Sequence, residues 1–216
     1  MKKSFLLPIM IFNLFAAHAQ NKFGLRGGIS FSSRDGSNSN STDLITIEAS
    51  GFAMVPLSAT VIMQPSIGYH PKGNKYRNLT FSDQSGSNIG YGDLSIRYDN
   101  IEVTIPFQYL ISKNKDQEFL LGLGPYFSYS FSGTGKWKNV SGQAAPPSTS
   151  KISFANGEKR FDAGINLLLT FQADKHWVLS VSYDRGLVPL YANTSLLQQT
   201  KLYTNSKGIS VGYLLK

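Results

Sequence analysis

Residues 119–131 read FLLGLGPYFSYSF, and this stretch decides how the rest of the chain is interpreted. Every second residue is bulky and apolar, while the residues between them are mostly small or hydroxylated. A period of two residues predicts a β-strand. Such a strand spans about 43 Å at about 3.3 Å per residue, which is longer than most soluble strands and sufficient to cross a bilayer at a tilt. Its apolar side needs an apolar partner along its whole length, either a second protein layer or lipid.

The first nineteen residues have the layout of a secretory signal peptide. Lys2 and Lys3 precede an apolar run that ends in Ala17-His18-Ala19. This order predicts cleavage after Ala19, so residues 1–19 are taken as the signal peptide and residues 20–216 as one mature domain. The chain has no Cys, so the exported domain is expected to fold without disulfides.

The net charge of +8 includes the two lysines of the predicted signal peptide, which leaves +6 for the mature domain. A basic surface could meet an anionic partner such as lipopolysaccharide or nucleic acid. The basic residues are spread over loops, however, and a solvated loop surface explains them more simply. We therefore expect no nucleic-acid partner, and we keep outer-membrane lipid and lipopolysaccharide as candidates.

Seven further segments repeat the alternation, and they lie at residues 23–32, 45–56, 61–70, 101–112, 161–172, 177–184 and 209–215. The connections between the eight segments are alternately long and short along the chain. An up-and-down meander produces this order when all its short turns lie at one end. The sequence therefore predicts an eight-stranded, antiparallel, up-and-down transmembrane β-barrel. The phase of residues 45–56 stays open, because both Ala53 with Val55 and Phe52 with Met54 could face the apolar side, and a bulge would explain this.

The bulky rows could face lipid, or they could face inward around an apolar ligand in a soluble, lipocalin-like barrel. The non-bulky rows carry few charges, which suits a crowded interior better than a solvated surface. Aromatic residues on the bulky rows also fall at both ends of the strands, as they do in the two girdles of membrane barrels. The short-turn girdle comprises Phe23, Tyr109, Phe119, Phe171, Trp177 and Tyr213, and the long-loop girdle comprises Tyr69, Tyr129, Phe131, Phe161 and Tyr183. We therefore favour lipid outside.

Eight strands leave an interior that side chains just fill, so an open pore is not expected. The polar side chains expected inside are Arg26, Gln64, Glu102, Gln108, Asp162, Asn166 and Asp184. A buried charge needs a partner, and our hypothesis is an ion pair between Arg26 and Glu102.

Seven stretches resemble the PorT-like outer-membrane β-barrel family, and they keep its motif order over the whole mature domain. They are FGLRGGIS at 23–30, QPSIGYHPKG at 64–73, IEVTIP at 101–106, GLGPY at 122–126, RFDAG at 160–164, YDRGL at 183–187 and GISVGY at 208–213. The resemblance implies an outer-membrane β-barrel at residues 20–216, in a family most of whose members have no assigned activity. One branch is linked to a protein secretion apparatus, which makes assistance to secretion an alternative role.

His70 is expected at the long-loop rim with Asp162 and Asp184, where a hydrolytic site is conceivable. A polar rim explains these residues more simply, and no group of residues has the spacing of metal ligands. We therefore expect no enzyme activity, no cofactor and no metal. The expected role is structural or interactive, with a possible protein partner at the outer loops, residues 71–93 and 133–157.

Overall fold

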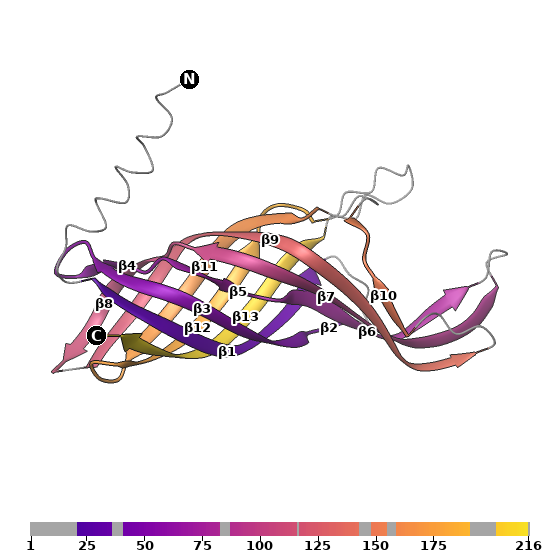
Figure 1. The fold of residues 1–216 in the computed structure, drawn as a ribbon, viewed down its shortest axis with the longest axis horizontal. Coiled ribbons are helices and arrows are strands. Elements are labelled where there is room, and N and C mark those ends of the chain that lie inside the picture. The colour runs from indigo at the N-terminus through magenta and orange to yellow at the C-terminus, as the bar shows by residue number, and fades with distance from the viewer. Residues whose placement is uncertain are drawn as a thin grey trace, which may run out of the picture.

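The computed structural model describes residues 21–35, 41–82, 87–115, 117–142, 148–154, 159–190 and 202–215. These residues form one sheet of thirteen strands (Figure 1). The strands are β1 (Lys22–Asp35), β2 (Ser41–Thr42), β3 (Leu44–Pro56), β4 (Val61–Met63), β5 (Ser66–Tyr69), β6 (Lys72–Ser82), β7 (Asn88–Thr104), β8 (Phe107–Asn114), β9 (Gln117–Gly142), β10 (Thr149–Lys151), β11 (Phe161–Gln172), β12 (Trp177–Gly186) and β13 (Tyr203–Leu215). In this part of the chain no helix has the length and apolarity needed to span a membrane. The predicted signal peptide lies outside the described residues.

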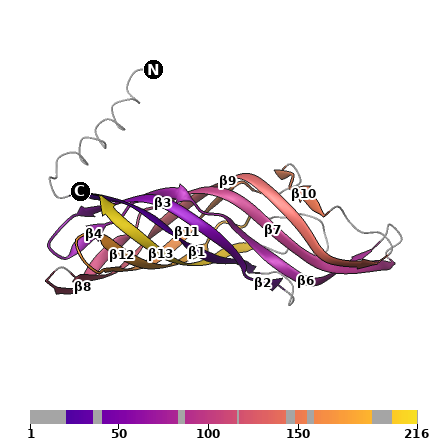
Figure 2. The same cartoon turned by 60° about the horizontal axis from the view of Figure 1, so that its bottom comes forward.

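The sheet closes on itself. Strand β1 pairs with β13 on one side and with β3 on the other, and the pairing runs from β13 through β12, β11, β9, β8 and β4 back to β3. A second route of pairing passes from β9 through β7 and β5 to β3. All of these pairs are antiparallel. The strands of these two routes are called the ring, and Figures 1 and 2 show them wound obliquely around one long axis.

The structure corrects the prediction of eight uninterrupted strands, because two of them are divided at prolines. Strands β4 and β5 are separated at Gln64 and Pro65, and β7 and β8 at Ile105 and Pro106. Proline has no N–H to donate to the ladder, so regular pairing stops there. Backbone bonds nevertheless bridge both breaks, from Gln64 N to Pro106 O at 2.9 Å and from Ile105 N to Pro125 O at 3.0 Å. The ring is therefore continuous across both prolines.

The predicted loops at 71–93 and 133–157 are largely strand, which is a second correction. Strand β6 and residues 88–93 of β7 occupy the former, and the end of β9 with β10 occupies part of the latter. We call β2, β6 apart from Lys72, β10, residues 88–98 of β7 and residues 133–142 of β9 the extension, and from here on the ring means the remainder of these strands. The extension projects from one end of the ring (Figure 1). Its sequence lacks a clean alternation because neither face has to be continuously apolar.

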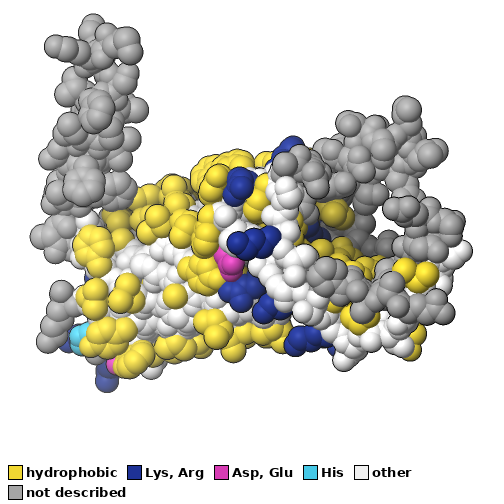
Figure 3. All heavy atoms as spheres, turned by 45° about the vertical axis from the view of Figure 1, so that its right-hand side comes forward, with side chains coloured by type: hydrophobic (Ala, Val, Ile, Leu, Met, Phe, Trp, Pro, Cys, Tyr) yellow, Lys and Arg dark blue, Asp and Glu magenta, His cyan; other side chains and the backbone are white. Residues whose placement is uncertain are grey.

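Exposure alternates along the ring strands. Outward apolar side chains remain exposed, as in Ile47 (76% exposed) and Leu123 (56%), whereas the residues between them are buried. We call the outward side chains the apolar band, which Figure 3 shows in part. Strand β3 keeps one phase throughout, with Phe52 and Met54 inward and no register shift against β1. The bulge expected there is therefore absent from the described pairing.

The interior has an apolar layer, formed by Phe52, Met54, Leu120, Val178 and Leu214. The inward side chain of Phe52 is accommodated because Gly24 lies against its phenyl group. A Cβ atom at position 24 would come within 2.5 Å of that phenyl group. The ambiguity of residues 45–56 thus has a physical reason, since this strand supplies bulky side chains to both faces.

Candidate functional site

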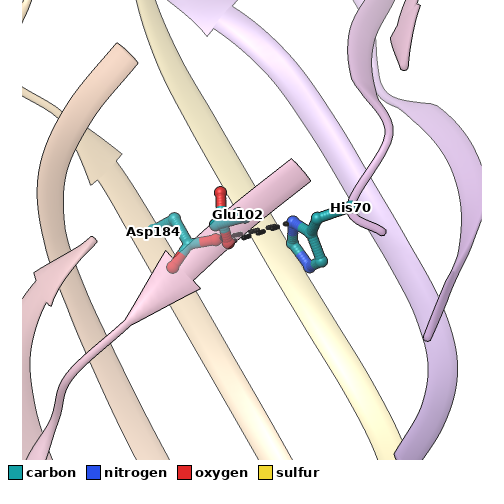
Figure 4. A group of neighbouring side chains, drawn as sticks. All are labelled: His70, Glu102 and Asp184. Carbon is teal, nitrogen blue, oxygen red and sulfur yellow. Dashed lines mark ion pairs between the residues drawn. The ribbon is translucent and has the colours of Figure 1, made fainter. Parts of the chain in front are cut away.

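Five charged or titratable side chains meet inside the ring, and we call them the inner ionic cluster. They are Glu48 on β3, His70 after β5, Lys72 at the start of β6, Glu102 on β7 and Asp184 on β12. All five occupy even positions, which place their side chains on the inner face of strands whose odd positions face outward. Figure 4 shows His70, Glu102 and Asp184 converging from different segments.

The cluster is a network of close ion pairs. The ammonium of Lys72 lies 2.5 Å from Glu102 Oε2 and 3.5 Å from Asp184 Oδ2. His70 Nε2 contacts Glu48, and its Nδ1 lies 3.3 Å from Glu102 and 4.0 Å from Asp184 (Figure 4). The side chains of Lys72, Glu102 and Asp184 are each at most 5% exposed. One lysine therefore holds together two carboxylates that would otherwise repel each other in a medium of low polarity.

Neighbouring polar side chains extend this network. Asn166 Nδ2 donates to Asp184 Oδ1 at 2.7 Å, and the Tyr126 hydroxyl donates to Asp162 Oδ2 at 2.9 Å. The Lys72 ammonium also lies 4.1 Å from the centre of the Tyr126 ring. The ring of Tyr126 fits against Gly164, where a Cβ would come within 2.7 Å of it.

A separate group of hydrogen bonds involves Gln64 and Gln108, both of which are buried. Gln108 Nε2 donates to Thr170 Oγ1 at 2.7 Å, and the Thr170 hydroxyl donates to Gln64 Oε1 at 3.4 Å. These bonds link β8 and the segment between β4 and β5 to β11, past the inner face of β9, which lies between β8 and β11 in the ring.

The predicted pairing of Arg26 with Glu102 is not among the ion pairs of the described residues. The Arg26 guanidinium donates to Ser50 Oγ at 2.8 Å and to Ser66 Oγ at 2.9 Å, whereas Glu102 pairs with Lys72 and His70. Arg26 and Glu102 do lie at one cross-strand level, because the register runs from Arg26 to Ser50, then to Gly68 and Glu102. Lys72 takes the position between the carboxylates instead.

The interior beside the cluster is nearly filled. A cavity of about 20 Å³ borders Arg26, His70 and Glu102, and another of about 20 Å³ borders Lys72 and Asp162. Each volume suits about one water molecule. Within the described residues, these spaces are far too small for a solute to pass.

His70, Glu102 and Asp184 bring ligand-type atoms within 4.8 Å of one another, which could suit a metal ion. The ammonium of Lys72 already lies against both carboxylates, so a metal would have to displace a buried cation. A hydrolytic group of His70 with Asp162 and Asp184 is not assembled either, since Asp162 accepts from Tyr126 while His70 is held between Glu48 and Glu102. The geometry fits a structural ion-pair network.

The aromatic residues expected in two girdles have their side chains on the outer face to different extents. Phe23, Tyr109, Tyr129, Phe131, Phe161, Trp177 and Tyr213 are exposed, and Tyr69, Phe119, Phe171 and Tyr183 are half-buried. Neighbouring aromatic side chains contact one another in both predicted girdles. The centroids of the Trp177 and Tyr213 rings are 5.2 Å apart in an edge-on arrangement, and those of Tyr69 and Phe131 are 6.3 Å apart. Such contacts add to the packing of adjacent strands.

Sequence reasoning placed Glu102 and Asp184 inside but did not find Glu48 or Lys72. Glu48 was missed because the phase of its strand was undecided. Lys72 continues the inward even positions of Gln64 and Ser66 past Pro71, so the alternation itself was the available signal. Reading a loop from Pro71 onward concealed it.

A closed antiparallel sheet with a polar interior and an exposed apolar outside belongs to the class of proteins built for the outer membrane. Residues 18–192 match the model of the family described as "Outer membrane protein beta-barrel domain". The chain belongs to this family, and the outer membrane is its location.

Several solved structures resemble the chain at low identity. Ail of Yersinia pestis is 11% identical with a TM-score of 0.42, over 90% of this chain and 97% of Ail. OprG of Pseudomonas aeruginosa is 13% identical with a TM-score of 0.43, over 92% and 97% of the two chains. Neisserial surface protein A is 9% identical with a TM-score of 0.43, over 88% and 96%. No curated protein matches.

Proposed function

We propose that the protein is an eight-stranded, up-and-down transmembrane β-barrel without catalytic activity, which acts as a structural or interaction protein of the outer membrane. The observation that carries this proposal is the alternation of the ring: apolar side chains are exposed outside while ionic and amide side chains are buried inside. In water, an apolar band of this extent would be a strong aggregation site. In a bilayer, the same band is the surface that acyl chains require.

The soluble, lipocalin-like alternative is disfavoured by the same observation. A soluble barrel turns its apolar rows inward around a ligand and its charged rows outward. Here Lys72, Glu102 and Asp184 are inside, and Leu25, Leu123 and Val211 are outside. The cavities of about 20 Å³ next to the cluster also favour a filled interior over a pore.

Two further parts of the proposal come from the sequence. Export through a cleaved signal peptide at residues 1–19 and a place in the PorT-like branch both follow from the motifs quoted above. Assistance to a secretion apparatus is the second candidate role, and the projecting extension favours it because it offers a paired, ordered surface to a partner outside the bilayer. In this arrangement the extension lies outside the cell and the short turns face the periplasm.

Membrane fractionation combined with gel mobility tests the proposal. We expect the protein to resist an alkaline wash, to require detergent for extraction, and to migrate differently on gels before and after boiling because a folded barrel resists unfolding. Crosslinking followed by copurification tests the secretion role separately. Extraction by salt or alkali without detergent would disprove the membrane-embedded barrel.

A further inference from the structure

A basic groove lies on the outer face where the extension leaves the ring. A β-bulge at Phe131 shifts the register between β7 and β9, since Asp99 pairs with Ser132 and Asn100 with Ser130. The shift moves the even positions of β9 to the outer face, so Lys136 and Lys138 are exposed there. They join the outward side chains of β7 in one continuous surface.

The cross-strand register collects further basic residues on this surface. Lys75 on β6 pairs with Ser95, which pairs with Lys136, so these three residues form a row across three strands. In the next row Arg97 pairs with Thr134, which pairs with Lys151 on β10. Figure 3 shows Lys and Arg side chains gathered around an acidic one beside the apolar band.

The groove has one apolar and one cationic side. It encloses about 440 Å³ and is lined by Leu44, Ile45 and Tyr69 toward the ring and by Arg97, Lys136 and Lys138 toward the extension, with Asp99 beside Arg97. Its apolar side continues into the apolar band through the exposed Ile45 and Ile47. A ligand that fills the groove would therefore place an apolar part along the ring and an anionic part against the extension.

The acidic groups near the groove are engaged by other side chains and by the backbone. Asp99 is engaged by Arg97 Nε at 3.0 Å and by the Tyr69 hydroxyl at 2.5 Å. Asp93 accepts from Asn139 Nδ2 at 2.8 Å and from Asn78 N at 3.1 Å.

Among the described residues, Lys136 and Lys138 form no ion pair, although Asp93 lies opposite Lys138 in the register. Like charges held together on a sheet face repel one another, and a multivalent anion relieves this.

We propose that this groove binds the phosphate groups of the outer-leaflet glycolipid, lipopolysaccharide, with Lys136 and Lys138 as the main phosphate ligands and the acyl chains along Ile45 and Ile47. The proposal rests on the proposed function, because it requires the ring to lie in the bilayer and the extension outside the cell. A free phosphate would use only the cationic side, whereas an amphiphile uses both sides of the groove. Juxtamembrane lysines commonly recognise anionic headgroups in this way.

Binding of purified, refolded protein to rough lipopolysaccharide tests the site, with the same lipid after removal of its phosphates as comparison. The variant is Lys136→Gln with Lys138→Gln. The matched control is Lys115→Gln with Lys175→Gln, which removes the same charge from exposed short turns. At about 1 kcal/mol per cation, the groove variant should bind the phosphorylated lipid roughly 30-fold more weakly, and the control should bind it normally. Neither variant should change binding of the dephosphorylated lipid.

Three results would overturn the inference. Unchanged binding by the groove variant would exclude these lysines, and an equal loss in the control would show that only net charge matters. Competition by inorganic pyrophosphate as strong as that by the lipid would show a simple anion site. Heat-modifiable mobility on gels is measured on every sample. If this mobility is retained while the groove variant binds normally, the groove assignment is wrong and the proposed function stands. If the unmodified protein lacks this mobility, the proposed function is wrong.

Discussion

Replacing Lys72 by Met should destabilise the protein strongly. Met has a similar length but no ammonium, so Glu102 and Asp184 lose the cation at 2.5 Å and 3.5 Å while remaining buried. Two carboxylates would then share a nearly dry interior with each other and with Glu48. The favourable position of the ammonium over the ring of Tyr126 would also be lost.

The magnitude follows from burial. Removing one partner of a buried ion pair usually costs about 3–5 kcal/mol, because the other charge keeps its desolvation penalty. Exposed pairs contribute about 0–1 kcal/mol. The pair between Lys113 and Glu118 is equally short at 2.6 Å, but the lysine side chain is 58% exposed. Lys113→Met is thus a control with a similarly short lysine–glutamate pair, in which the lysine is exposed and has one carboxylate partner instead of two.

The free energy of unfolding is measured by urea titration of the protein folded into lipid vesicles. Tryptophan fluorescence and gel mobility report the unfolding. We expect Lys72→Met to lower this free energy by about 3–5 kcal/mol and Lys113→Met by less than about 1 kcal/mol. The double variant Lys72→Met with Glu102→Gln should recover part of the loss, since one unpaired charge is removed. Equal effects of the two lysine variants, or no recovery in the double variant, would refute the electrostatic account of the cluster.

Three further predictions use the same titration. Leu123→Arg places a charge on an exposed position of the apolar band. If that position meets lipid, the free energy of unfolding in vesicles should fall by about 2–4 kcal/mol. A change within about 0.5 kcal/mol, as is usual for water-exposed sites, would contradict lipid contact. Phe52→Ala should cost about 3–5 kcal/mol through the cavity left in the inner apolar layer, and a loss below about 1 kcal/mol would place that side chain outside the packed core.

For Asp174, the backbone N–H groups of Trp177 and His176 donate to the carboxylate and hold the pKa of Asp174 below its ordinary value. A carboxylate whose pKa is lower in the folded state contributes stability above its unfolded pKa, and this contribution is lost as pH falls through the folded pKa. The difference in stability between the unmodified protein and Asp174→Ala should therefore shrink in acid below about pH 4. A pH-independent difference would contradict this.

The ring was readable from the sequence because each of its strands satisfies two different environments at once. Ile209, Val211 and Tyr213 on β13 stay outside while Ser210 is buried between them, so a period of two appears directly in the residues. The extension gives no such signal. Its outer face carries polar groups such as Lys75 and Arg97, and its pairing depends on backbone hydrogen bonds that any sequence can form.

The inner ionic cluster was only half readable for a related reason. Alternation tells which side chains face inward, and it predicts Glu102 and Asp184 on the inner face, where both are buried. Contacts across the interior depend on the stagger between strands that are distant in sequence, such as the strands of Lys72 and Asp184. No local pattern encodes that stagger, so Arg26, which lies at the same level as Glu102, was chosen in place of Lys72.

The length of β9 explains how one sheet can serve both the membrane and the space beyond it. The strand has 26 residues and is about 86 Å long, whereas about 9–11 tilted residues cross a bilayer. It pairs with β7 and β11 in the ring and continues past the bulge at Phe131 into the extension. The strand that anchors the extension is therefore also one of the hydrogen-bonded strands that close the ring. Lys136 lies five residues beyond Phe131, about 16 Å along the strand, so its height above the aromatic rim is set by strand geometry. A charge carried on an irregular loop would have no such fixed height, and for that reason a paired extension suits recognition of groups at a defined depth of the membrane surface.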